Sequence, residues 1–314
     1  MSEILKNVMP PPWIKYPALS EFSLGWRMGA AEDYKFKFWQ WFERLDEAAQ
    51  KAYARAFPYP CFWHYGGWDG LDETPENERV KCAHGGDRCC LEPRNFEFSE
   101  CDELRDDTDD FYREGLPFWR RDGAAKYDKT SLINSSEAHE FLFFYKPDAT
   151  ADESCLGQWQ SSPFAVDADE YACAEQFMMA SKARIFGDEQ TRARIMQSRD
   201  AKQMKALGRQ VRGFDERLWG EVRYSVVLSG NYYKFTQNPA MMRFLLATGD
   251  KILVEASPLD KIWGIGLGRQ SENASRPSAW RGQNLLGFAL MEVRDELRRL
   301  YKNYDLIDKK FLRD

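Results

Sequence analysis

The pattern of apolar and polar positions changes character near residue 130. Between Tyr34 and Phe57, apolar residues recur at three- and four-residue spacing, which predicts one or two amphipathic helices. From residue 60 to 130 this periodicity is lost, and glycine, proline and charged residues dominate. The pattern therefore predicts an N-terminal region 1–130, a domain 131–305 and a short tail 306–314.

Helical spacing dominates the second half of the chain. Apolar runs at 139–145 and 252–256 predict buried strands, and residues 262–266 are expected to be extended as well. The combination predicts a predominantly helical α+β domain. The predicted helices, separated by glycine- or aspartate-rich breaks, cover residues 175–186, 188–198, 201–211, 218–228, 239–248 and 285–301.

The N-terminal region is dense in aromatic side chains, including Trp13, Trp26, Trp39 and Trp41. Their helical spacing favours a packed core, and a platform on which nucleobases stack is the alternative. Nothing in these residues identifies a ligand, so an unknown partner is the only expectation for the region.

Composition narrows the class of protein. With 43% hydrophobic and 15% aromatic residues, the 314-residue chain has enough apolar surface to fold. We expect a soluble, cytoplasmic protein without membrane contact, because the sequence lacks an apolar run of 18 residues and a signal-like start. The net charge of -6 disfavours broad capture of nucleic acid, although a local basic site remains compatible with it.

Seven cysteines, an odd number, favour free thiols in a reducing compartment. Cys61, His64, Cys82 and His84 are weak candidates for a zinc site, because thiolates and imidazoles are its preferred ligands. Their spacing is irregular, so we expect neither a metal nor a cofactor.

Two charged residues share one face of the helix predicted at 175–186. Glu175 and Lys182 lie two turns apart, about 10 Å along the axis, which is too far for an ordinary surface pair. They are therefore candidates to flank a ligand, and two solvated surface charges are the alternative.

Two further stretches combine polar groups with turns. Asp260, Trp263 and Gly264 follow the strand predicted at 252–256, where a binding loop or an ordinary turn fits the pattern. Asn284 precedes the last helix, where it is expected to cap the helix or to bind an anion or a sugar hydroxyl.

Taken together, these stretches resemble the NADAR (YbiA-like) family over about residues 135–302. The matching blocks, in chain order, are Ser162-Pro163-Phe164, Ala174-Glu175-Gln176-x-Met178-x-Ala180-x-Lys182-Ala183, Leu207-Gly208-Arg209, Lys234-Phe235-x-Gln237-Asn238, Leu253-Val254-Glu255-Ala256-Ser257-Pro258-x-Asp260-x-x-Trp263-Gly264-x-Gly266 and Asn284-Leu285-Leu286-Gly287.

The resemblance implies hydrolysis of an N-glycosidic bond to ribose. Its substrates would be phosphoribosylamino-pyrimidine intermediates of riboflavin synthesis or, alternatively, ADP-ribose on guanine in nucleic acid. By carry-over, Glu175 acts on the ribose hydroxyls or as general acid/base, and Asp260 stabilises the cationic sugar or activates water. Lys182 offers a second branch, because a desolvated amine can trap the ring-opened sugar as a Schiff base.

The remaining expectations concern substrate binding. Arg209, with Arg223 as a weaker candidate, would hold phosphate, and Trp263 would stack on the base or pack against the sugar. Phe164, Gly264 and Asn284 complete the expected binding residues. Gly157-Gln158 departs from a Ser-Asn pair in many relatives, which points to altered base specificity. A non-catalytic nucleotide-sugar sensor is the rival from another class.

Overall fold

The computed structural model describes residues 5–61, 63, 68, 116, 125–146 and 152–312 of the chain. It divides into two compact units: Met1–Pro117 with Glu296–Asp314, and Phe118–Asp295. We call these unit 1 and unit 2. The functional division at residues 130 and 305 stays a prediction.

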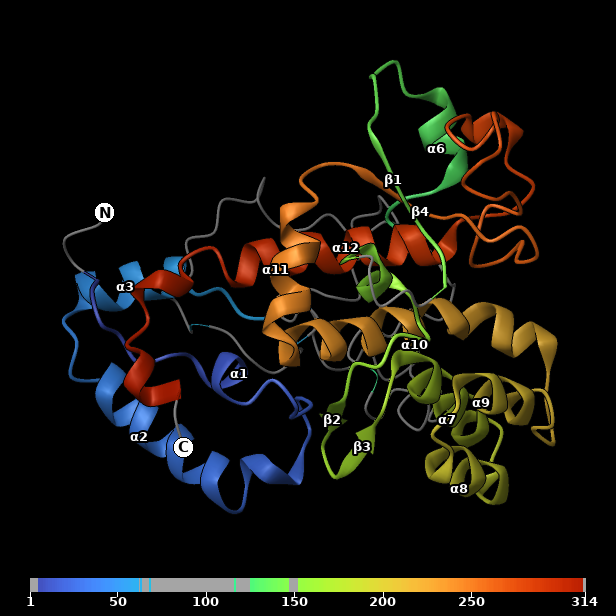
Figure 1. The fold of residues 1–314 in the computed structure, drawn as a ribbon. Coiled ribbons are helices and arrows are strands. Elements are labelled where there is room, and N and C mark those ends of the chain that lie inside the picture. Colours follow the sequence, from blue (N-terminus) through green and yellow to red (C-terminus); the bar gives the residue numbers. More distant parts are fainter. Residues whose placement is uncertain are drawn as a thin grey trace, which may run out of the picture. The chain divides into compact units, whose positions relative to one another are not determined.

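Helices make up most of unit 2 (Figure 1). Four of them begin after an aspartate, Asp128, Asp188, Asp200 or Asp215, whose carboxylate accepts a backbone N–H of the first turn. The helices are α6 (Lys129–Asn134), α7 (Ala174–Ile185), α8 (Glu189–Gln197), α9 (Ala201–Gly208), α10 (Glu216–Gln237), α11 (Pro239–Ala247) and α12 (Leu285–Leu300), the last of which runs on into unit 1.

Helix α10 is longer than predicted. Its end was predicted at residue 228, whereas the helix continues to Gln237. Its second half is buried on all sides, including polar residues such as Ser229 and Asn231. A helix surrounded by protein has no polar face, so the amphipathic pattern that reveals a surface helix is missing there.

Two short sheets accompany the helices. Strands β1 (Phe141–Phe144) and β4 (Ile252–Glu255) pair in parallel, and β2 (Phe164–Val166) and β3 (Asp169–Tyr171) form an antiparallel hairpin. The prediction of β1 and β4 is confirmed, and the hairpin was not predicted. The predominantly helical α+β fold is therefore also confirmed. No helix among the described residues is long and apolar enough to cross a membrane.

The expectation of an extended segment at residues 262–266 was wrong. The chain bends there, because one carboxylate oxygen of Asp260 accepts the backbone N–H groups of Ile262 and Trp263 at 2.9 and 2.8 Å. Those amides are consequently used within a turn rather than in a strand pair.

Gly287 lets α12 approach β4 closely. A methyl group at this position would overlap the carbonyl oxygen of Leu253 and the side chain of Asn284. We expect Gly287→Ala to lower the free energy of unfolding by about 1–3 kcal/mol, the usual cost of overpacking. Urea denaturation measures this, with Gly220→Ala as the control, since a methyl group there meets nothing within 4 Å. Equal effects of the two substitutions would contradict this explanation.

Unit 1 is built around aromatic side chains. The predicted amphipathic helices are present as α2 (Ala30–Phe42) and α3 (Glu47–Ala56), after a short α1 (Pro12–Lys15). The rings of Phe38, Phe42 and Tyr53 pack together, and the Tyr53 hydroxyl donates to the Met9 carbonyl at 2.6 Å. The segment predicted as a tail belongs to this unit, where Ile307 bridges Val8.

Candidate active site

Glu175 is the most buried carboxylate of the predicted site. It lies in the first turn of α7, and only 2% of the residue is exposed. Burial raises its pKa to about 7, and the nearby Asp260 carboxylate adds to the rise. Its Oε1 atom is shielded from solvent and has no hydrogen-bond partner. Such a group holds a proton near neutral pH and has an oxygen available for a ligand.

Glu255 is a second carboxylate of this kind, at the end of β4. Burial raises its pKa to about 8, and the charges of Asp260 and Glu175 contribute in the same direction. Its Oε2 atom is likewise shielded and without a partner. The charge of Glu175 raises the pKa of Glu255, and burial raises the pKa of both carboxyls, so that both hold a proton near neutral pH; we call them the Glu175–Glu255 pair.

Asp260 is held by its own loop close to this pair. One of its oxygens accepts the two turn amides described above, which fixes the side chain. Gly264 is needed beside it, because a Cβ there would meet the backbone oxygen of Glu255 at 2.8 Å. The loop predicted to bind ligand thus packs directly on the strand that carries Glu255.

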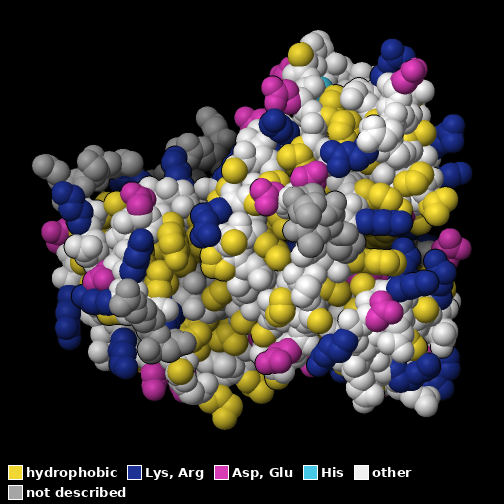
Figure 2. Space-filling model, in the orientation of Figure 1, with side chains coloured by type: hydrophobic (Ala, Val, Ile, Leu, Met, Phe, Trp, Pro, Cys, Tyr) yellow, Lys and Arg dark blue, Asp and Glu magenta, His cyan; other side chains and the backbone are white. Residues whose placement is uncertain are grey.

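Cations of α9 balance these acids. The charges of Lys205 and Arg209 lower the pKa of Glu175. The charge of Asp260 acts to raise the pKa of Arg223 in α10. The Lys205 ammonium also lies 5.8 Å from the centre of the Trp159 ring, and the Trp159 side chain acts on Glu175 as a hydrogen-bond donor. Lysine and arginine side chains also gather on the surface where α8, α9 and the start of α10 lie (Figure 2).

Lys182 lies apart from the carboxylates within α7. Its ammonium donates to the Gly208 carbonyl at 2.9 Å and lies 3.9 Å from the centre of the Phe214 ring and 5.6 Å from that of Trp219. Partial burial lowers its pKa, which favours the neutral, nucleophilic amine. The charges that act most strongly on Glu175 belong to Lys205, Asp260 and Arg209 instead.

Asn284 and Phe164 serve the structure around the site. The Asn284 amide is fully buried; it accepts the Glu255 N–H at 3.0 Å and donates to the Leu253 carbonyl at 2.9 Å. It therefore holds β4 rather than capping α12. Phe164 packs on the rings of Tyr171 and Phe177. Direct contact of either residue with substrate stays a prediction that these contacts do not favour.

Lys234 is a buried lysine. It stands in one of the blocks that match the family, but the sequence indicated no role for it. It is 0% exposed, and burial lowers its pKa to about 8. Its ammonium donates to the Gly157 carbonyl at 2.9 Å, and the next residue, Gln158, accepts the backbone N–H of Glu175 at 3.0 Å. Lys234 thus anchors the segment that positions Glu175.

Lys234→Met is expected to lower kcat/KM about 10²-fold, the order of loss seen when a reacting group is displaced by 1 Å. Methionine keeps the apolar stem but removes the donor to Gly157. The measurement is the initial rate of N-glycosyl hydrolysis, with exposed Lys202→Met as control. Wild-type kcat/KM in the Lys234 variant would show that the anchor is dispensable.

Glu255, Lys205, Trp159 and Lys234 were missed as site residues. Glu255 and Lys234 stand inside the motif blocks, so proximity to other motif residues was an available signal. Lys205 and Trp159 carry no such signal. The packing of α9 against α7 brings Lys205 to Glu175, and the folding of the segment before β2 brings Trp159 there.

The weak metal prediction finds no support among the residues that the structure describes, where no cluster of three or more potential ligands occurs. Cys61 is not in a disulfide there. His64, Cys82 and His84 lie outside the described residues.

Comparison with known proteins places the chain among enzymes. The NADAR domain model matches residues 143–298. "N-glycosidase R617" of Acanthamoeba polyphaga mimivirus is 41% identical over 166 residues, which cover 51% of this chain and 98% of that protein. "Riboflavin biosynthesis protein VVA0006" of Vibrio vulnificus (strain YJ016) is 28% identical over 56% of this chain and 43% of its own length.

Among solved structures, the E. coli protein YbiA is similar, with 24% identity, a TM-score of 0.42 and coverage of 52% of this chain and 90% of that one. Nearly the whole length of the mimivirus relative is matched. The domain match and the relatives that are named N-glycosidases show that the chain belongs to the NADAR family and is a hydrolase of N-glycosyl bonds.

Proposed function

We propose that the chain hydrolyses the bond between ribose and the amine nitrogen in phosphoribosylamino-pyrimidine intermediates of riboflavin biosynthesis. The observation that carries this proposal is the pair Glu175 and Glu255, which holds a proton near neutral pH. An amine leaves ribose only when its nitrogen is protonated, so a carboxyl that is still protonated at pH 7 suits this bond. The name of the relative VVA0006 supports the substrate class.

The reaction breaks the C1–N bond of the ribose. A carboxyl of the Glu175–Glu255 pair gives its proton to the leaving nitrogen, while the Asp260 carboxylate stabilises the positive charge that develops on the sugar. Water then adds to C1, and the proton that it loses returns to the ionised carboxylate. The products are the free amine and ribose 5-phosphate, and the enzyme regains its starting protonation state.

The cations of α9 suit the phosphate of this substrate. Arg209, directly after the last residue of α9, offers a guanidinium with fixed donors, and Lys205 within α9 adds a second positive charge. The Trp159 ring, already close to Glu175, and Trp263 in the loop after β4 are the aromatic surfaces offered to the base.

A covalent branch through Lys182 remains a proposal of its own. Ring opening of the substrate would leave C1 as an iminium of the leaving amine. The neutral Lys182 amine would add to C1 and expel the leaving amine, forming a Schiff base between lysine and sugar that water later hydrolyses to the sugar aldehyde and the free lysine. We expect borohydride to trap substrate on wild-type enzyme but not on Lys182→Met, as measured by intact mass. The control is exposed Lys202→Met. Absence of an adduct on the wild type eliminates this branch and leaves direct hydrolysis.

The substrate is tested by incubating purified enzyme with two compounds in parallel and separating the products by HPLC. One is the freshly generated phosphoribosylamino-pyrimidine, and the other is an oligonucleotide with ADP-ribosyl guanine. Release of ribose 5-phosphate from the first alone is expected. Restored guanine in the second alone would replace the proposal with removal of ADP-ribose from nucleic acid. Turnover of neither, with binding of ADP-ribose, would leave a sensor.

A further inference from the structure

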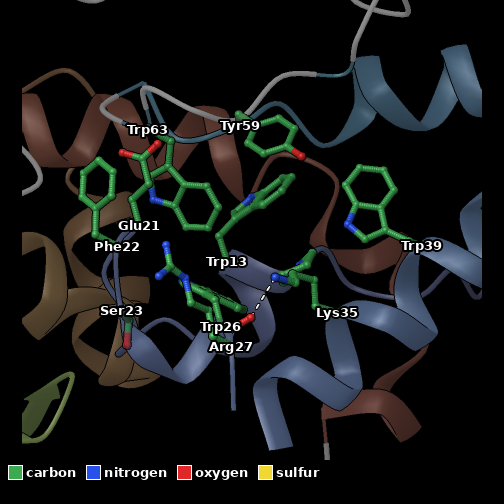
Figure 3. A pocket seen from close by; sticks show the side chains of 11 residues that line it. Trp13, Glu21, Phe22, Ser23, Trp26, Arg27, Lys35, Trp39, Tyr59 and Trp63 are labelled. Atoms are coloured by element: carbon green, nitrogen blue, oxygen red, sulfur yellow. Dashed lines mark hydrogen bonds between the residues drawn. The ribbon is translucent and has the colours of Figure 1, made fainter. Parts of the chain in front are cut away.

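Unit 1 contains a cavity that the N-glycosidase chemistry does not use. Its volume is about 560 Å³, within the range typical of small-molecule sites. We call it the aromatic pocket. Its walls include the rings of Trp13, Trp26, Trp39, Tyr59 and Trp63, which surround a common space (Figure 3).

Two of these rings offer faces for stacking. Trp39 and Trp63 are partly exposed, whereas Trp13 and Trp26 are buried. The ring contacts of Trp39 with its neighbours are all edge-on, and those of Trp63 are edge-on or tilted. Because no described ring stacks parallel on Trp39 or Trp63, a planar ligand can do so.

The polar groups of the aromatic pocket are mostly donors. The Lys35 ammonium is fixed at the wall by one bond to the Trp26 carbonyl at 2.8 Å, which leaves two N–H groups (Figure 3). Arg27 adds an exposed guanidinium, and Glu21 is the one carboxylate among the described lining residues. The indole N–H of Trp13, in a residue only 3% exposed, is buried without a partner.

We propose that the aromatic pocket binds a nucleotide, with the base stacked on Trp39 or Trp63 and the phosphate held by Arg27 and Lys35. Flat rings beside two cations match a ligand that joins a planar base to an anion. An apolar or proline-rich peptide would use the rings but would bring no negative charge to Arg27 and Lys35. The inference does not depend on the proposed substrate of unit 2.

Isothermal titration of the full chain with guanosine 5′-monophosphate tests the proposal. The protein carries Glu175→Gln so that turnover cannot interfere, and Arg209→Gln is added in a parallel sample to separate binding in unit 2. We expect Trp39→Leu to weaken binding about tenfold, since stacking on one base has about this effect. Arg27→Gln is expected to weaken it about fivefold and to reduce its salt dependence.

Matched controls lie on the same unit outside the pocket lining. Trp41→Leu removes an indole two residues from Trp39, and Arg44→Gln removes an exposed guanidinium; neither is expected to change the affinity. Guanosine and ribose 5-phosphate, each lacking half of the ligand, are expected to bind at least about tenfold more weakly.

The nucleotide could be a free mononucleotide or part of a nucleic acid. Titration with an eight-nucleotide single strand distinguishes these two sources. Tighter binding of the strand than of the mononucleotide, lost in Trp39→Leu, identifies a nucleic acid end or loop as the ligand, and equal binding identifies a free nucleotide. The proposal is overturned if nucleotide binding is unaffected by both Trp39→Leu and Arg27→Gln. It is equally overturned if only a proline-rich peptide binds in a way that these variants abolish.

Discussion

Glu175→Gln is expected to lower kcat by about 10²–10⁴-fold, the usual contribution of a general acid or base. Glutamine keeps the shape of the side chain but neither donates nor accepts a proton in the reaction. The fold should persist, because burial already favours the neutral form of this side chain. Initial rates of ribose 5-phosphate release, followed by HPLC, measure the effect.

The matched control is Glu170→Gln, which removes an exposed carboxylate from β3 in the same unit. It is expected to keep the wild-type rate. A Glu175 variant within about fivefold of wild type, which is close to 1 kcal/mol in the barrier, would refute the acid/base assignment.

The second large effect concerns stability against pH. The folded-state pKa values of about 7 and 8 for Glu175 and Glu255 exceed the ordinary value of 4.5. The protonated carboxyls are therefore compatible with the folded state, and this contribution to stability is complete below pH 4.5. It is lost as the pH rises through 7 and 8, because the folded state must then hold buried charges.

Each unit of pKa difference corresponds to about 1.4 kcal/mol. Ionisation of the pair therefore lowers the free energy of unfolding by several kcal/mol between acidic and alkaline pH. The double variant Glu175→Gln with Glu255→Gln is expected to flatten the decline in the free energy of unfolding between pH 5.5 and 8.5. Urea denaturation at several pH values measures this. If the double variant declines as steeply as wild type, other groups cause the loss.

The sequence predicted much of the helical framework because most helices of unit 2 have a polar face. It failed where burial removes that face, as in the second half of α10, and where strands are three residues long, as in β2 and β3. The prediction of an extended segment after β4 was also wrong. There the Asp260 carboxylate accepts hydrogen bonds from the backbone N–H groups that a strand would have paired with a neighbouring strand.

The candidate site was predictable in part. The motif pattern singled out Glu175 and Asp260, whose charges interact in the structure. The sequence pattern did not show that the Asn284 amide holds strand β4, and it therefore grouped this residue with those expected to bind substrate. It also did not find Lys205, because the proximity of α9 to α7 depends on packing that no local spacing records. The borohydride experiment tests Lys182, and the roles of Arg209 and Trp263 stay predictions.

The central claim is that the Glu175–Glu255 pair supplies the proton for cleavage of the N-glycosyl bond. The pH dependence of kcat, measured between pH 5.5 and 9 while circular dichroism confirms the fold, tests it most directly. We predict that kcat falls as the pH rises through 7 to 8, and that Glu255→Gln shifts or removes this fall. A rate that stays constant up to pH 9 in both proteins would contradict the claim.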